Sequence, residues 1–166
     1  PNIYGEQGIN TKFRSAHPNV AVYNPYKNYE TIIVSIGHGG KLIETSINSS
    51  SPTTQINAGL SDMPHGLTAY RGGWFVTDTT KGEVLFLTKN FEVVEKVELF
   101  GFPGKTSDLG DIEWVQNTKV ISGEKYLSVD ANRGLIALDK EKMEYNIFQP
   151  DGEWCLQDLI SATAIL

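Results

Sequence analysis

The sequence predicts an all-β protein, a β-propeller of four-stranded antiparallel blades, and three observations support this prediction. Short runs of β-branched and aromatic residues alternate with glycine-containing turns, most clearly in residues 63–87. Similar strand starts recur at residues 19, 66, 111 and 158, at intervals of 47, 45 and 47 residues. No segment carries a helical period longer than one turn. Four short strands with tight turns need roughly 40–50 residues, which agrees with this interval.

The chain of 166 residues is long enough for one domain with a hydrophobic core. We expect a single partial propeller over residues 1–166. Its blades are predicted at residues 17–62, 63–107 and 108–154, with the start of a fourth at 155–166. In the third unit, the pattern predicts a first strand at residues 109–115 and an insertion at 116–123.

Two matching turns support the repeat. The first contains Asp78 and Gly82, and the second contains Asp130 and Gly134. We expect both aspartates to accept backbone N–H groups and both glycines to supply a positive φ, so these four residues are predicted to build turns. The basic residues of the same turns, Lys81 and Arg133, are predicted to be solvated.

A propeller needs about four to eight blades to close, and three blades leave strand edges and sheet faces uncovered. We therefore expect further blades from one of two sources. The first is a longer parent chain, which we favour because the sequence stops within a blade pattern at Leu166. The second is another copy of this chain, which would complete a six-bladed ring.

Composition limits the partners. The net charge is −6 and the basic residues are scattered, which argues against binding to nucleic acid. No apolar run approaches the roughly 20 residues that a membrane-spanning helix needs. With 40% hydrophobic and 20% charged residues, the chain is predicted to be soluble and globular. A single cysteine, Cys155, allows no internal disulfide, and the cellular compartment stays undetermined.

The best-formed unit resembles an NHL-type blade. The resemblance rests on Pro64-His65-Gly66-Leu67-Thr68-Ala69-Tyr70, Trp74-Phe75-Val76-Thr77-Asp78 and Lys81-Gly82-Glu83-Val84. The pattern extends over residues 17–166 and is similar to that of the six-bladed gluconolactonase/SMP-30 and strictosidine-synthase-like propellers. It is also similar to a family of propellers that share the Met-Pro-His lead-in and have no known activity. The resemblance implies that the first strand of each blade lines a central channel.

Residues at the starts of these first strands should then converge at one mouth of the channel. They are His17, Asn19, His65, Asp111, Glu113, Gln157 and Asp158. Such a ring would suit a divalent cation, either Ca²⁺ or Zn²⁺, although nothing in the sequence requires a cofactor. It would also suit acid–base catalysis, with His65 and Asp111 as the catalytic residues. The alternative is that these side chains cap turns and bond the backbone.

The principal functional prediction is a binding or scaffolding module that presents its loop rim and central channel to a protein or a small molecule. The alternative is a metal-assisted hydrolase, lactonase or lyase that uses His65, Asp111 and Asp158. A third possibility is sulfuryl or acyl transfer by His17 or His65. The fold by itself favours none of these functions.

Aromatic residues within strands, such as Trp74 and Phe86, are predicted to pack between blades. The cluster of Tyr23, Tyr26 and Tyr29 around Pro25 has two interpretations. We expect these rings to pack within the turn, and the alternative is an exposed contact surface.

Overall fold

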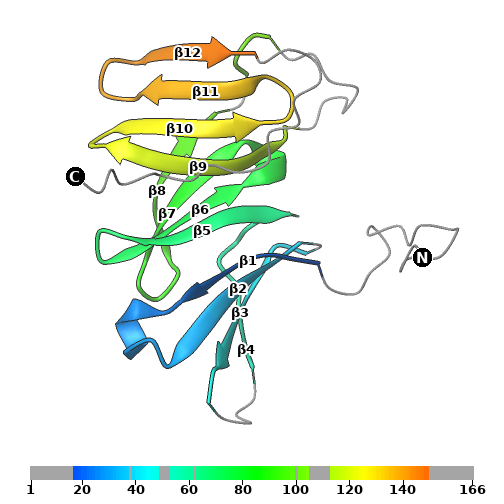
Figure 1. Ribbon diagram of the computed structural model, residues 1–166, viewed down its shortest axis with the longest axis vertical. Coiled ribbons are helices and arrows are strands. Elements are labelled where there is room, and N and C mark those ends of the chain that lie inside the picture. Colours follow the sequence, from blue (N-terminus) through cyan, green and yellow to red (C-terminus); the bar gives the residue numbers. More distant parts are fainter. Residues whose placement is uncertain are drawn as a thin grey trace, which may run out of the picture.

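The computed structural model describes residues 17–37, 39–48, 53–61, 63–99, 101–104 and 113–149 (Figure 1). Over these residues the chain forms three four-stranded antiparallel sheets and two short 3₁₀ turns. None of the helical segments in these ranges is long and apolar enough to cross a membrane. The prediction of an all-β protein with four-stranded antiparallel sheets is confirmed.

The strands follow chain order within each sheet. Sheet A contains β1 (His17–Tyr23), β2 (Thr31–Gly37), β3 (Lys41–Ser46) and β4 (Thr54–Ile56). Sheet B contains β5 (Pro64–Tyr70), β6 (Gly73–Asp78), β7 (Glu83–Thr88) and β8 (Val93–Glu98). Sheet C contains β9 (Val115–Ser122), β10 (Lys125–Asp130), β11 (Gly134–Asp139) and β12 (Glu144–Phe148). The 3₁₀ turns are η2 (Pro25–Lys27) and η3 (Thr79–Lys81).

The first strands of the three sheets are neighbours in space. Strand β1 contacts β5, and β5 contacts β9. Figure 1 shows the other strands of each sheet extending away from this row, so that β4 and β12 lie at opposite ends of the molecule. The starts of the first strands are thereby brought to one side of the structure.

Each first strand has a register irregularity near its start. It falls between Pro18 and Val20 in β1 and between His65 and Thr68 in β5. In β9 it falls between Val115 and Asn117, which pair with Asp130 and Val129 of β10. The repeated bulge re-aims the side chains that follow it, and it marks equivalent positions in the three sheets.

The first strand of sheet C, β9, differs from the prediction in its position. The sequence pattern predicts this strand at residues 109–115 with an insertion at 116–123, but β9 covers Val115–Ser122. The extra length of the third unit therefore precedes the strand. The prediction was wrong because β9 is polar where a buried strand is usually apolar. Thr118 is buried and its Oγ1 lies 2.9 Å from the Oγ of buried Ser128, so a hydrogen bond offsets the burial of both hydroxyls.

Sheet B is covered on both sides, because all six residues of β6 are buried. Successive side chains of a strand point to opposite faces. Trp74 and Val76 accordingly join a core between sheets A and B, and Phe75 joins a core between sheets B and C. The sheets therefore pack face to face as layers, with strand aromatics between them.

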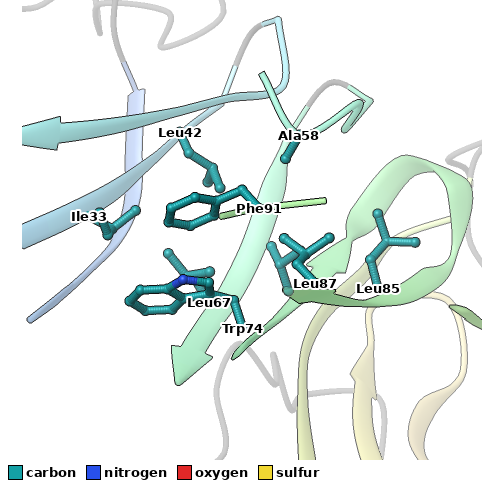
Figure 2. Close-up of a cluster of buried hydrophobic side chains, with 9 residues drawn as sticks. Ile33, Leu42, Ala58, Leu67, Trp74, Leu85, Leu87 and Phe91 are labelled. Atoms are coloured by element: carbon teal, nitrogen blue, oxygen red, sulfur yellow. The ribbon is translucent and has the colours of Figure 1, made fainter. Parts of the chain in front are cut away.

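The core between sheets A and B is centred on two stacked rings (Figure 2). The rings of Trp74 and Phe91 lie 5.2 Å apart between centroids and nearly parallel, at 14°. Phe91 follows β7 and takes a φ of 68°, and its ring lies beside Ile33 and Leu42 of sheet A. The β7–β8 turn is thereby fixed against sheet A.

Candidate functional site

The residues predicted to line the channel mouth are only partly described. Asp111, Gln157 and Asp158 lie outside the described residues. His17 is the first residue of β1. The structure defines contacts of Asn19, His65 and Glu113. These contacts show whether the three side chains face one another or bond to other parts of the protein.

Asn19 joins sheet A to sheet B. Its Nδ2 donates a hydrogen bond of 2.8 Å to the carbonyl oxygen of Pro64, at the start of β5. The buried hydroxyl of Ser35, on β2, donates to the same carbonyl at 3.2 Å. Asn19 therefore bonds the backbone of Pro64, the residue that precedes His65.

His65 is half-buried, and its Nδ1 has two contacts that orient the ring. Its Nδ1 lies 2.8 Å from the carbonyl oxygen of Met63 and 2.7 Å from Oγ1 of buried Thr79. A carbonyl oxygen can only accept, so Nδ1 carries the proton and the acceptor nitrogen of the neutral ring is Nε2. Met63 has a φ of 67°, a conformation that costs energy for a residue other than glycine. The backbone at Met63 thus helps to fix the orientation of the imidazole.

Gly66 follows directly and allows three strands to meet. Its φ is 62°, and a Cβ added there would lie 2.6 Å from Oδ1 of Asn117 and 3.0 Å from Oγ1 of Thr77. The hydroxyl of Thr77 is fully buried and has no hydrogen-bond partner among the described residues. A side chain at position 66 would displace both polar groups, so glycine is needed at this position.

Glu113 belongs to a buried ionic network rather than to an open ring. Arg133 donates from Nη1 to Glu113 at 2.6 Å and to Asp130 at 2.6 Å, and from Nε to the carbonyl oxygen of Phe102 at 2.9 Å. Burial alone would lower the pKa of Arg133, but its hydrogen bonds to Glu113 and Asp130 outweigh this and raise it. The prediction that Arg133 is solvated was wrong, because the residue is only 2% exposed.

The turn residues are also engaged within the protein. Asp130 Oδ1 accepts from the backbone N–H of Asn132 at 2.7 Å, inside its own turn. Asp78 Oδ2 accepts from the backbone N–H of Ser61 at 3.0 Å, which ties the β6–β7 turn to the connection between sheets A and B. Gly82 and Gly134 have φ values of 65° and 91° at the ends of these turns.

No group of three or more His, Cys, Asp or Glu side chains in the described part of the chain could hold a metal ion. Asn19, His65 and Glu113 all make contacts within the protein. A cation site that includes Asp111 or Asp158 therefore stays a prediction.

A separate groove lies between sheets A and B, beyond the ends of β1 and β7. It is therefore distinct from the region of His65, which lies near the start of β5. The volume of the groove is about 410 Å³. The groove is lined by Asn24, Tyr26, Lys27, Glu44, Ile56, Lys89, Asn90 and Phe91. Tyr26 donates a 2.7 Å hydrogen bond to the carbonyl oxygen of Gly73, and its ring meets Trp74 edge to face. The groove wall is therefore anchored to sheet B.

Glu44 supplies a fixed negative charge to this groove. Its carboxylate accepts from Asn24 Nδ2 at 2.9 Å, from Thr31 Oγ1 at 2.7 Å and from Lys27 Nζ at 2.8 Å. Burial would raise the pKa of Glu44, but these hydrogen bonds and the charge of Lys27 lower it below its usual value. Glu44 therefore remains ionised in mildly acidic solution.

The lowered pKa of Glu44 predicts an acid-dependent loss of stability. A group whose pKa is lower in the folded protein stabilises the fold above its unfolded pKa, and this contribution disappears as pH falls through the folded value. We expect Glu44→Gln to be destabilising near neutral pH and to lose stability less steeply than the parent protein below about pH 4.5. Urea unfolding at a series of pH values measures both effects. Parallel pH profiles for the two proteins would show that Glu44 is not responsible.

The three tyrosines around Pro25 lie in different environments. Tyr26 packs against Trp74, as expected for turn packing. Tyr23 and Tyr29 are 61% and 62% exposed, which agrees with the alternative of a contact surface. Sequence reasoning did not find the groove, because Glu44 and Phe91 come from other parts of the chain. Tyr26 was the one signal that pointed to it.

Comparison with known proteins does not assign a function. No protein family model matches this chain, and no curated protein matches it either.

Proposed function

We propose that the chain is a binding or scaffolding module of the β-propeller type. Three features support this proposal: the sheets pack face to face, their first strands are neighbours, and each sheet runs in chain order. The resemblance of residues 64–84 to an NHL-type blade points in the same direction.

One observation favours binding over catalysis. The polar side chains at the starts of the first strands serve the fold, since Asn19 bonds the backbone of sheet B and Glu113 pairs with Arg133. An acid–base or metal site needs several such groups directed at a substrate. The hydrolase alternative would now depend on Asp111 and Asp158, which lie outside the described residues.

We place the binding surface in the groove between sheets A and B. Its volume of about 410 Å³ falls within the range of ligand sites, roughly 300–1,000 Å³. Tyr26 is 38% exposed and offers apolar surface, and Asn24 and Asn90 are amide residues that line the same groove. Lys27 and Lys89 outnumber the single carboxylate of Glu44, so the groove carries an excess of positive charge. This chemistry suits a short peptide segment that carries an acidic side chain.

The proposal is tested by titrating the ¹⁵N-labelled protein with capped tetrapeptides that differ only in one residue, glutamate or lysine. We expect the glutamate peptides to shift the amide signals of Tyr26, Lys27, Lys89 and Asn90, and to bind at least tenfold more tightly than the lysine peptides. Asn90→Trp, at an exposed turn position, should fill the groove and abolish binding.

Lys142→Trp is the matched control, because Lys142 is exposed in the corresponding β11–β12 turn. It should leave peptide binding unchanged. Equal affinity for both peptide sets, or signal shifts that avoid the groove, would refute the assigned ligand class.

A further inference from the structure

A second cavity lies between sheets B and C, beside the β5–β6 and β9–β10 turns. Its volume is about 370 Å³, within the roughly 300–1,000 Å³ that is typical of ligand sites. Sheet B lines it with Tyr70 and Arg71, among others, and sheet C lines it with the end of β9. None of its residues lines the groove between sheets A and B, so the cavity is a separate candidate site.

The charged residues that line this cavity are both basic. They are Arg71 and Lys119, and no described Asp or Glu lines it with them. Lys119 is half-buried and forms no ion pair with any residue that the structure describes. The groove between sheets A and B differs, because Glu44 lies beside its lysines. A cavity lined by two cations without a carboxylate favours an anionic ligand.

Arg71 occupies a turn position that arginine rarely adopts. Tyr70 pairs with Gly73, so Arg71 and Gly72 form a two-residue hairpin loop. Their φ values are 47° and 79°, and positive φ at both positions is typical of a type I′ turn, where Asn-Gly is favoured. The left-handed conformation costs free energy for a residue that has a Cβ. The geometry of the turn therefore gives no reason for arginine at this position.

The contacts of Arg71 within the protein are weak. Its guanidinium carbon lies 5.0 Å from the centroid of the Tyr70 ring. Its Nη1 lies 3.6 Å from Oε1 of Glu124, which is longer than a hydrogen bond, and the Arg71 side chain is 60% exposed. Glu124 is also shared with Lys140, at 3.6 Å. Since exposed ion pairs contribute little to stability, the guanidinium keeps N–H donors for a ligand.

The ring of Tyr70 forms a fixed wall of the cavity. Its centroid lies 6.2 Å from that of Phe75 and 5.7 Å from that of Phe86, and both of these rings are buried. Tyr70 and Val120 are half-buried, and Ile121 is 61% exposed. These three residues offer apolar surface to a ligand in the cavity.

We propose that this cavity binds a small organic anion, a carboxylate attached to an apolar body. Arg71 pairs with the carboxylate, since its planar guanidinium can donate two parallel hydrogen bonds to that group. Lys119 adds a second positive charge, and the apolar body lies against Tyr70 and Val120. The inference goes beyond the proposed function, because it concerns a second site and does not rest on the groove between sheets A and B.

Titration of the ¹⁵N-labelled protein with three probes tests the ligand class. Phenylacetate carries both a carboxylate and a ring, phenylacetamide lacks the charge, and acetate lacks the ring. We expect phenylacetate to shift the amide signals of Arg71, Lys119 and Ser122, and to bind at least tenfold more tightly than either other probe. The absence of saturable binding, or equal affinity for phenylacetate and either other probe, would overturn the inference.

Arg71→Asn separates ligand binding from the stability of the turn. Asparagine tolerates the left-handed conformation better than arginine, so the midpoint of urea unfolding should not fall. Phenylacetate should nevertheless bind at least tenfold more weakly. Lys142→Asn is the matched control, because it removes one positive charge from an exposed turn residue that does not line the cavity.

The control should bind phenylacetate like the parent protein. Unchanged binding in Arg71→Asn, or an equal loss in both variants, would contradict a ligand site at Arg71. A lower unfolding midpoint together with weaker binding in Arg71→Asn would show that the arginine serves the turn, and would contradict the site as well.

Two further variants keep this test apart from that of the groove between sheets A and B. Asn90→Trp fills that groove and should leave the binding of phenylacetate unchanged. Ser122→Trp, at the exposed end of β9, should block phenylacetate and leave the glutamate peptides bound. Loss of phenylacetate binding in Asn90→Trp, or its persistence in Ser122→Trp, would place the probe elsewhere and refute the second site.

Discussion

Arg133→Met is expected to lower the free energy of unfolding by about 3–5 kcal/mol, the range measured when one partner of a buried ion pair is removed. Methionine fills much of the space of the arginine stem but offers no hydrogen-bond donor. Asp130 is 1% exposed and would keep its charge without a partner on that side. Glu113 and the carbonyl oxygen of Phe102 would lose their donors as well.

Urea unfolding followed by tryptophan fluorescence measures this loss. Lys125→Met is the control, because Lys125 pairs with Asp139 at 3.6 Å but its side chain is 55% exposed. Exposed pairs of this kind contribute at most about 1 kcal/mol. Similar small losses for Arg133→Met and Lys125→Met would show that the Arg133 network does not stabilise the fold.

Gly40→Ala is expected to cost about 2–5 kcal/mol, from a strained backbone together with a steric overlap. Gly40 ends the β2–β3 turn with a φ of 57°. A Cβ there would lie 2.0 Å from the carbonyl oxygen of Ser61 and 2.4 Å from that of Leu60. These atoms are backbone in the connection between sheets A and B, so neither can move aside by rotating a side chain.

Gly59→Ala separates strain from overlap. Gly59 has a φ of 68°, but an added Cβ would meet nothing within 4 Å. This control should lose only the roughly 1–2 kcal/mol that the left-handed conformation costs an L-residue. Urea unfolding measures the free energy of unfolding of both variants. If both lose the same free energy, the close approach of Gly40 to the backbone of Leu60 and Ser61 does not stabilise the packing of sheet A on sheet B.

Residues 63–87 show why the strands could be predicted. The strand pattern and the glycines at 72, 73 and 82 are local signals, and β5, β6 and β7 form where those signals place them. Strand β9 shows the limit of this reasoning. Its buried Thr118 is compatible with the interior only because Ser128, ten residues away, supplies a hydrogen bond. Hydrophobic patterning contains no information about such a partner.

The candidate site was less predictable than the fold. The repeat placed Asn19 and His65 at the starts of neighbouring strands, and the structure brings them close together. It did not predict that Asn19 would bond the carbonyl oxygen of Pro64, or that Arg133 would be buried between Asp130 and Glu113. The Asn19–Pro64 and Arg133–Glu113 bonds join residues 45 and 20 positions apart in sequence, whereas Asp130 lies only three residues before Arg133.

The sequence by itself determined the all-β class, the four-strand units and the turn residues, because each depends on conformational preferences within a few residues. Only the tertiary structure decided which polar side chains serve the fold. It also decided that Tyr26, Glu44 and Phe91 line one groove. The physical reason is that burial and hydrogen bonding depend on which segments pack together, and packing between sheets joins residues about a full repeat apart.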